Sequence, residues 1–219
     1  MKMETNEENT RRVRELEEEL SDERIGEFFR EGGDMGQMNR PLRARYARGV
    51  LRTVLVAGAA VACLAVALQF FTPRIVRDAS MEGTIERMDC VVVAKRAYDS
   101  GGVGFGDIIQ HGSSMPDGAG GTRELINRVI GLPGDEIDIQ ARGVYRNGEL
   151  LVEPYVADGG AGEAWMRVTV PEGSCFVLGD NRKGSLDSRD DIVGFVADGD
   201  IRGKVVFRLL PVSRAGGVE

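Results

Sequence analysis

An apolar run without a single charge constrains this chain more than any other feature. TVLVAGAAVACLAVALQFF covers residues 53–71, and only Thr53 and Gln69 within it are polar. About 20 apolar residues are needed to cross a hydrocarbon core about 30 Å thick, so the run is long enough. A buried core helix would carry a polar stripe, and a cleavable signal peptide has a shorter apolar region after a short basic start. We therefore expect a transmembrane helix over residues 48–72.

The charges before this run predict the orientation of the helix. Residues 4–35 are rich in Glu and Asp, whereas residues 40–52 carry five arginines and no acid. Positive charge beside a membrane span favours the cytoplasmic side. We expect a single-pass plasma-membrane protein with residues 1–47 as a cytoplasmic acidic tail ending in a basic stretch. Apolar residues between positions 13 and 28 fit either a partner-binding amphipathic helix or a mobile tail.

Composition excludes some classes of function. The formal net charge of −7 argues against nucleic-acid binding, which requires a basic face. The lipid bilayer is the first expected partner. Cys63, Cys90 and Cys175 show no metal-ligand spacing, and no cofactor motif is present. Cys90 and Cys175 are more often two buried thiols than a bridge, and the spacing leaves both possible. His111 stands in a loop-like stretch, and we expect it to be solvated and without a role.

Residues 73–219 have the pattern of an antiparallel, mainly β domain outside the membrane. Short apolar runs alternate with turn residues, and no helical period separates them. Asn147-Gly148 between two extended runs predicts a type I′ hairpin, and the Gly/Ser-rich residues 111–122 predict a loop. The expected strands are Cys90–Lys95, Asp107–Gln110, Leu125–Ile130, Glu136–Gln140, Met166–Val170, Cys175–Leu178 and Lys204–Leu209.

Two polar segments are candidates for chemistry. Ser80 follows the apolar run by nine residues, so even an extended chain of about 3.3–3.6 Å per residue keeps it near the membrane surface. The segment GDNRKGSLDSR, residues 179–189, directly follows an expected buried strand. It contains more hydrogen-bonding side chains than a simple turn requires. Its acidic and basic members, with Asp187 and Arg189 as a charge-assisted pair, predict a polar network.

Four stretches of the exported part resemble the motifs of type I signal peptidases, the membrane-anchored Ser/Lys proteases. Residues 80–85, SMEGTI, resemble the nucleophile motif S-M-x-P-T-L, and residues 89–95, DCVVVAK, resemble the strand that follows it. Residues 127–135, NRVIGLPGD, resemble the lysine motif K-R-V-I-G-L-P-G-D. Residues 179–189 match the last motif, G-D-N-R-x-x-S-x-D-S-R, at every defined position.

The resemblance implies a β-rich fold, a serine endopeptidase activity and signal peptides of exported preproteins as partners. Ser80 would be the nucleophile, and the substrate would lie extended along a strand edge, with small residues at the first and third positions before the cut. The supporting residues would come from the last motif: Asp180, Asn181, Arg182, Ser185, Asp187 and Arg189.

Four positions depart from the family pattern. Asn127 stands where the family keeps its lysine, and an amide cannot act as a base near neutral pH. Asp78 stands two residues before Ser80, where a carboxylate would oppose the developing oxyanion. Gly83 replaces a proline and Met88 replaces a glycine.

Two functions therefore remain open from the sequence. One is a signal peptidase with an unusual or weak site, which cleaves signal peptides if it is active. The other is a non-catalytic relative that binds or chaperones exported precursors. Loss of a general base typically costs about 10²–10⁴ in rate. Lys183 of the last motif is a conceivable substitute base, although an exposed loop lysine is the simpler interpretation.

Overall fold

The computed structural model describes residues 27, 30–31, 40–116, 120–156, 160 and 165–218. The apolar pattern between positions 13 and 28 lies outside these residues, apart from Glu27. The chain divides into two compact units, Met1–Val66 and Ala67–Glu219.

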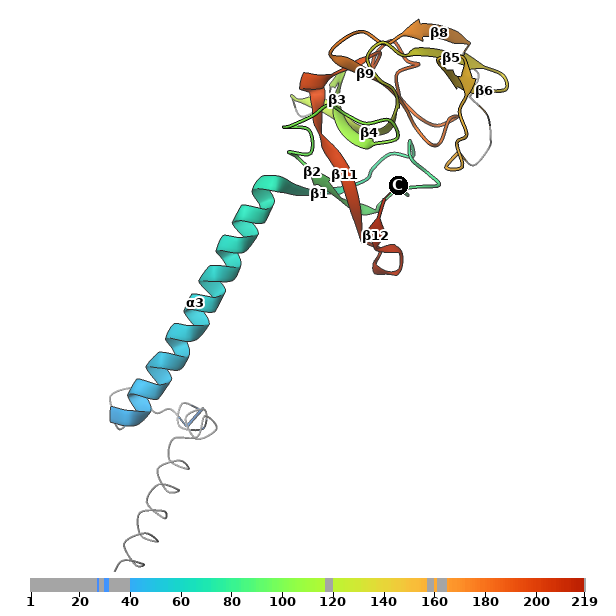
Figure 1. Ribbon diagram of the computed structural model, residues 1–219. Coiled ribbons are helices and arrows are strands. Elements are labelled where there is room, and N and C mark those ends of the chain that lie inside the picture. Colours follow the sequence, from blue (N-terminus) through green and yellow to red (C-terminus); the bar gives the residue numbers. More distant parts are fainter. Residues whose placement is uncertain are drawn as a thin grey trace, which may run out of the picture. The chain divides into compact units, whose positions relative to one another are not determined.

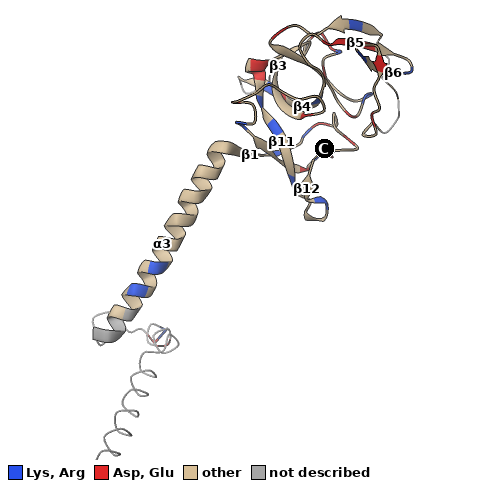
Figure 2. Cartoon of the chain, in the orientation of Figure 1, with Lys and Arg blue, Asp and Glu red and all other residues tan. Residues whose placement is uncertain are grey.

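A long helix carries the apolar run. Helix α3 spans Arg40–Phe70, with Pro41 in its first turn, where the missing N–H costs nothing. The candidate span Tyr46–Phe70 contains an 18-residue window with a mean hydropathy of 2.2, and none of that window is buried by the protein. Val56, for example, is 69% exposed. Figure 2 shows the second half of α3 without charged residues. A helix that is apolar on every side and uncovered by protein suits a lipid environment.

The remainder of the chain is built of antiparallel strands. The larger sheet has eight strands in the order β1-β2-β11-β3-β4-β9-β10, with β12 paired to β11. Figure 1 shows these strands curving around one another. Their bounds are β1 Phe71–Ile75, β2 Cys90–Ala94, β3 Ile108–Pro116, β4 Thr122–Gly131, β9 Ser174–Leu178, β10 Val196–Ala197, β11 Ile201–Leu210 and β12 Gly216–Gly217. A 3-10 turn, η1, covers Asp198–Asp200 before β11, and a second, η2, covers Val212–Arg214 after it. The predicted mainly β, antiparallel fold class after one apolar helix is therefore correct.

A second, four-stranded sheet has the order β7-β6-β5-β8 and lies at the end of the domain away from β12 (Figure 1). Asn147 and Gly148 join β6 to β7 with φ values of 54° and 82°. A type I′ turn requires positive φ at both positions, so the hairpin prediction is confirmed. The strands are β5 Glu136–Gln140, β6 Gly143–Arg146, β7 Glu149–Leu150 and β8 Met166–Thr169.

The loop predicted over residues 111–122 is wrong for its first half. Residues 111–116 continue strand β3, where His111 pairs with Leu125 of β4 and Ile201 of β11. Pairing with β4 continues to Pro116, and β11 pairs as far as His111, which outweighs the low strand propensity of a Gly/Ser-rich stretch. The expected solvated His111 is also wrong, because its exposed fraction is 0%.

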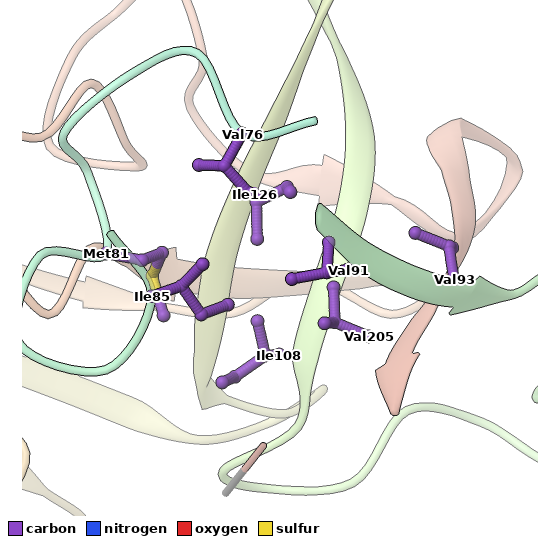
Figure 3. Packing of buried hydrophobic residues seen from close by; sticks show 8 residues of the cluster. All are labelled: Val76, Met81, Ile85, Val91, Val93, Ile108, Ile126 and Val205. Carbon is purple, nitrogen blue, oxygen red and sulfur yellow. The ribbon is translucent and has the colours of Figure 1, made fainter. Parts of the chain in front are cut away.

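The core around β2, β3, β4 and β11 fixes the segment that carries Ser80. In Figure 3, Met81 and Ile85 of the connection between β1 and β2 point at Ile108, Ile126 and Val91 of the sheet. Both are fully buried. At about 1.5–3 kcal/mol for each buried side chain of this size, the two residues pin the segment firmly to the sheet.

Candidate active site

Ser80 lies in a short turn that is held against the sheet. Its exposed fraction is only 2%. Its backbone N–H donates to Oδ1 of Asp78 at 3.1 Å. The neighbouring N–H groups of Thr84 and Ile85 donate to the carbonyl oxygen of Met81 at 3.0 and 2.7 Å. Within the described part of the chain, no hydrogen bond engages the Ser80 hydroxyl.

The segment after β9 packs directly on the Ser80 turn. The backbone N–H of Asn181 donates to the carbonyl oxygen of Ser80 at 3.0 Å. The Asn181 amide nitrogen donates to the carbonyl oxygen of Ala79 at 3.1 Å. A Cβ atom at Gly179 would overlap both the Ser80 carbonyl oxygen and the side chain of Ser185. Only glycine at 179 therefore lets the Ser80 turn and Ser185 approach each other this closely.

A buried carboxylate joins three segments at the site. Asp180 accepts a hydrogen bond from the Thr84 hydroxyl at 2.5 Å, and Thr84 belongs to the Ser80 turn. Asp180 also accepts a bidentate pair from Arg128 of β4, at 2.9 and 2.7 Å. The ion pair is almost wholly buried, with side chains 4% and 1% exposed. Such planar pairing is rigid, so the turn, β4 and the segment after β9 are held in one arrangement.

Asp187 and Arg189 form the second buried pair, as the sequence predicted. The Asp187 carboxylate accepts from the Arg189 guanidinium at 2.8 Å through both Nε and one Nη. It also accepts the backbone N–H of Gly179 at 3.0 Å. Burial acts to lower the pKa of Arg189, but Asp187 raises it more, so the guanidinium stays charged. The pair fixes the path of the chain behind Ser185.

Arg182 reaches away from Ser80 to a residue that no motif indicated. Its guanidinium forms a buried bidentate pair with Glu153, and its Nε donates to the Gly179 carbonyl oxygen at 3.0 Å. Tyr155 follows Glu153, and its ring lies 3.9 Å below the guanidinium of Arg128. Burial raises the pKa of Tyr155 above its usual range, so its phenol stays protonated.

Asn127 is fully buried on β4 and is bonded at both ends of its amide. Its Nδ2 lies 3.2 Å from Oγ of Ser185 and 3.4 Å from the carbonyl oxygen of Leu186. Its Oδ1 lies 2.9 Å from Nε2 of His111. The structure thus brings Ser80, Gly179, Ser185 and Asn127 into one neighbourhood, linked through Gly179 and Ser185.

Two of the described lysines have partners away from Ser185 and Asn127. Lys95 donates to the carbonyl oxygen of Leu68 at 2.6 Å, and Lys204 pairs with Asp107 at 2.5 Å. Lys183 is exposed. The position beside Ser185 is filled by the Asn127 amide.

Two of the unusual residues have unusual backbone conformations. Gly83 has φ of +103°, a conformation that proline cannot adopt because its ring fixes φ near −65°. Met88 has φ of +70° and is exposed. A glycine at position 88 would adopt this conformation without the steric cost that a Cβ brings. The turn around Ser80 is therefore adapted to glycine at 83 and tolerates strain at 88.

Several site residues were missed by sequence reasoning. Thr84 and Arg128 lie inside recognised motifs, and their polar character was the available signal. Glu153 stands in an undistinguished polar stretch. His111 carried no signal, because its neighbours suggested a loop. Cys90 and Cys175 are free thiols in the structure. Among the described residues, no group of histidine, cysteine or acidic side chains is placed to hold a metal ion.

Comparisons with known proteins identify relatives. A family model described as "Signal peptidase, peptidase S26" matches residues 47–210. "Probable signal peptidase I-1" of Synechocystis sp. is 37% identical over 158 residues, which cover 70% of this chain and 79% of that protein. "Signal peptidase I" of Bacillus caldolyticus is 36% identical over 154 residues, covering 64% and 80%. The crystal structure of a signal peptidase I from Enterococcus faecalis V583 is 30% identical, covers 48% of this chain and 97% of that chain, and has a TM-score of 0.41.

Proposed function

Because the chain belongs to the signal peptidase family, peptidase S26, we propose that it acts on the signal peptides of exported preproteins at a membrane surface. Ser80 is the nucleophile of this proposal, and the reaction is that of a serine endopeptidase. The observation that carries it is the packing of the Ser80 turn against the segment 179–189 across Gly179. That packing puts a reactive hydroxyl beside a rigid polar scaffold.

In the proposed reaction, the Ser80 oxygen attacks the carbonyl carbon of the scissile peptide bond. The peptide nitrogen leaves with a proton, and water then releases the acyl group from Ser80. The hydroxyl proton must be accepted as the oxygen attacks, and the oxygen that becomes negative must be stabilised. The ion pairs of Asp180 and Asp187 neither accept this proton nor stabilise the negative oxygen. It holds Ser80 and Ser185 in place, which is the positioning part of catalysis.

The chemistry of two residues opposes fast cleavage. We infer that Asn127 occupies the position of the family's lysine base, which the motif alignment and its contact with Ser185 support. An amide there cannot take the Ser80 proton. The Asp78 carboxylate accepts the Ser80 backbone N–H. This N–H is the kind of donor that stabilises an oxyanion, and the negative charge beside it has the wrong sign.

These two residues favour a second candidate function. A chain with the scaffold but without the base would bind signal peptides or exported precursors and leave them uncut. The buried Asn127, bonded at both ends, is the specific observation in its favour. The two candidates share substrate class and location and differ in whether Ser80 reacts.

The proposed location follows from the helix and its charges. Helix α3 supplies one candidate span, Tyr46–Phe70. Arg48 and Arg52 lie in its N-terminal half, and more arginines precede them. The positive-inside tendency then puts the N-terminus in the cytoplasm and residues 73–219 on the outer side of the plasma membrane. Signal peptides emerge on that side of the membrane during export.

The deciding experiment measures cleavage of a preprotein by the full chain in detergent. We expect slow cleavage that Ser80→Ala abolishes. Asn127→Lys supplies a base but leaves Asp78 opposing the oxyanion. The double variant Asn127→Lys with Asp78→Ser should therefore gain clearly more than the two single changes together, because such residues act as one unit. A gain of about 10²–10⁴ over wild type would match a restored general base.

Control variants separate the two candidates. Lys183→Ala should leave the rate unchanged, since Lys183 is exposed. If the Lys183→Ala variant no longer cleaved the preprotein, Lys183 would be the base. Cleavage that survives Ser80→Ala would refute Ser80 as the nucleophile. If neither wild type nor the double variant cleaves, while crosslinking still captures a signal peptide at the Ser80 turn, the binding function is the correct one.

A further inference from the structure

An ion pair joins two strands that are not neighbours in the larger sheet. The Arg74 guanidinium of β1 donates to Oε2 of Glu124 in β4. Strands β2, β11 and β3 lie between β1 and β4 in the order of the sheet. Gln110 of β3, which is buried, also donates to Oε2 of Glu124 at 2.5 Å and holds this carboxylate in place. The proposed reaction gives the Arg74–Glu124 pair no task.

Both strands have an edge that no other described strand covers. Strand β1 is the first strand of the larger sheet and pairs with β2 alone. Strand β4 pairs with β9 only at Arg128–Gly131, so residues 122–127 have no partner on that edge among the described strands. Unpaired strand edges present N–H and C=O groups to which an extended peptide adds as a further strand. The proposed substrate therefore has two strand edges on which to pair.

The two edges lead to the candidate site. Strand β1 runs into the Ser80 turn, and β4 runs into Asn127. Strand β1 also follows the apolar helix directly, because α3 ends at Phe70 and β1 begins at Phe71. In a signal peptide the apolar region precedes the small residues of the cleavage site. A peptide that leaves the membrane beside α3 therefore runs in the direction of β1, towards Ser80.

One face of β1 and β4 carries an apolar pair and a charged pair. Val76 continues the pairing of β1, since its N–H donates to the carbonyl oxygen of Asp89 at 2.9 Å. Figure 3 shows Val76 and Ile126 side by side in the buried cluster that also holds the Ser80 turn. Residues two apart in a strand point to the same face. Arg74 and Glu124 each precede the apolar pair by two residues, so they lie on that face, further from Ser80.

We propose that the Arg74–Glu124 pair is the specificity-determining contact for the third residue before the cut. This inference rests on the proposed function, since it concerns the peptide that Ser80 attacks or holds. The side chains of an extended peptide beside β1 alternate in the same way as those of β1. The residue next to Ser80 then faces Val76 and Ile126, and the residue two positions earlier faces the ion pair. The residue between them points to the opposite side.

A charged floor and an apolar floor prefer different small side chains. Ala, Gly or Ser above the ion pair leaves the guanidinium and the carboxylate together, and a Ser hydroxyl hydrogen-bonds with either group. Val would cover two charged groups whose side chains are 44% and 32% exposed to solvent, and would remove their water without replacing it. At the apolar floor of Val76 and Ile126, a Ser hydroxyl would be buried without a partner. The third position should therefore accept Ser and reject Val, whereas the first should prefer Ala to Ser.

Binding of synthetic signal peptides by the full chain in detergent tests this assignment. The chain carries Ser80→Ala so that the peptides stay uncut, and the peptides have Ala, Ser or Val at the third position before the cut. Fluorescence anisotropy of labelled peptides gives the affinities. We expect the Ala and Ser peptides to bind equally well and the Val peptide to bind about ten-fold more weakly, because the charged groups lose water.

Changing the floor should change the preference. Arg74→Leu together with Glu124→Leu makes the floor apolar, so this double variant should bind the Val peptide better than the Ser peptide. Arg74→Glu together with Glu124→Arg keeps an ion pair and should keep the original preference. Arg167→Ala is the matched control, because it breaks an exposed ion pair with Asp138 in the other sheet. It should leave all three affinities unchanged.

The outcomes separate this inference from the proposed function. If the peptides bind but the Leu double variant ranks Ser and Val as the unchanged floor does, the inference is wrong and the proposed function stands. If no signal peptide binds to the chain with the original floor, the proposed function fails and this inference fails with it. Should the Leu double variant not fold, Arg74→Ala decides, because it removes only a half-exposed guanidinium. That variant should relieve the rejection of Val, and a rejection that persists would overturn the inference.

Discussion

Replacement of Asp187 by alanine should destabilise the domain more than any surface charge change. The Asp187 carboxylate is fully buried and accepts hydrogen bonds from the backbone N–H groups of Gly179 and Arg189 and from the Arg189 guanidinium. Alanine removes the counter-charge that Asp187 provides and leaves the Gly179 N–H without its acceptor. Breaking a buried pair of this kind costs about 3–5 kcal/mol.

The expected change is large enough to measure by thermal unfolding of the full chain in detergent. For a chain of this size, 1 kcal/mol shifts Tm by about 2–4 °C, so Asp187→Ala should lower Tm by about 6–20 °C. Asp187→Asn keeps the shape and one acceptor oxygen, and it should cost less. Because the pair fixes the chain behind Ser185, cleavage or signal-peptide binding should fall with it at temperatures where the variant is still folded.

A surface pair provides the matched control. Arg96 and Asp99 lie 3.8 Å apart with side chains 57% and 66% exposed. Exposed pairs contribute about 0–1 kcal/mol, so Asp99→Ala should leave Tm nearly unchanged. If Asp187→Ala shifted Tm no more than Asp99→Ala does, the reasoning would fail, and residues 179–189 would be an ordinary surface loop.

Three further predictions test other parts of the molecule. Burial acts to raise the pKa of Asp135, but hydrogen bonds, led by the one from Arg146, outweigh burial and hold this pKa below 3.8. The ionised carboxylate therefore stabilises the fold at a pH above the unfolded-state pKa, and this stabilisation is lost as the pH falls through the folded-state pKa. Asp135→Asn removes this group, so the loss of stability with acid should become less steep below about pH 4. Burial raises the pKa of the Cys175 thiol to about 12. Iodoacetamide at pH 8 should therefore modify Cys90 before Cys175, and Cys175 should stay unmodified until the protein unfolds. Equal modification rates of the two thiols would contradict the burial of Cys175. Protease added outside spheroplasts should digest residues 73–219 and spare the cytoplasmic tail, whereas a protected β domain would reverse the proposed orientation.

Much of the β framework could be predicted from local patterns. The apolar run predicted the long helix, and alternation with turn residues predicted the strand Glu136–Gln140 with its observed bounds. Asn147-Gly148 predicted the hairpin because only a few residues accept positive φ. These elements share one property, namely that residues close in sequence determine them.

Elements fixed by distant neighbours could not be predicted. The stretch 111–116 has weak strand propensity, yet it pairs with β4 as far as Pro116, and β11 pairs with its first residue, His111. Strand β1 begins at Phe71, the last residue of the apolar run, because it pairs with β2. The burial of His111 follows from that pairing. Residue type alone could not reveal it.

The candidate site shows the same division between local pattern and distant contact. The motifs indicated Ser80, Ser185 and Asp187 as members of one site, and the structure packs their segments together. Distance along the chain gave no hint that Asp180 would bind both Thr84 and Arg128. Nor could Glu153 be selected among the many acidic residues of the chain, since its partner Arg182 lies in another segment.

The scaffold and the chemistry of this site depend on different residues. The pairs Asp180–Arg128 and Asp187–Arg189 hold the Ser80 turn and Ser185 in place. Neither pair involves position 127, so the arrangement persists with an asparagine there. A motif match therefore reports mainly on the scaffold, and fold or family alone does not establish activity. The Asn127 amide is bonded at both ends, to Ser185 and to His111, so position 127 is filled by a side chain that holds its neighbours without being able to act as a base.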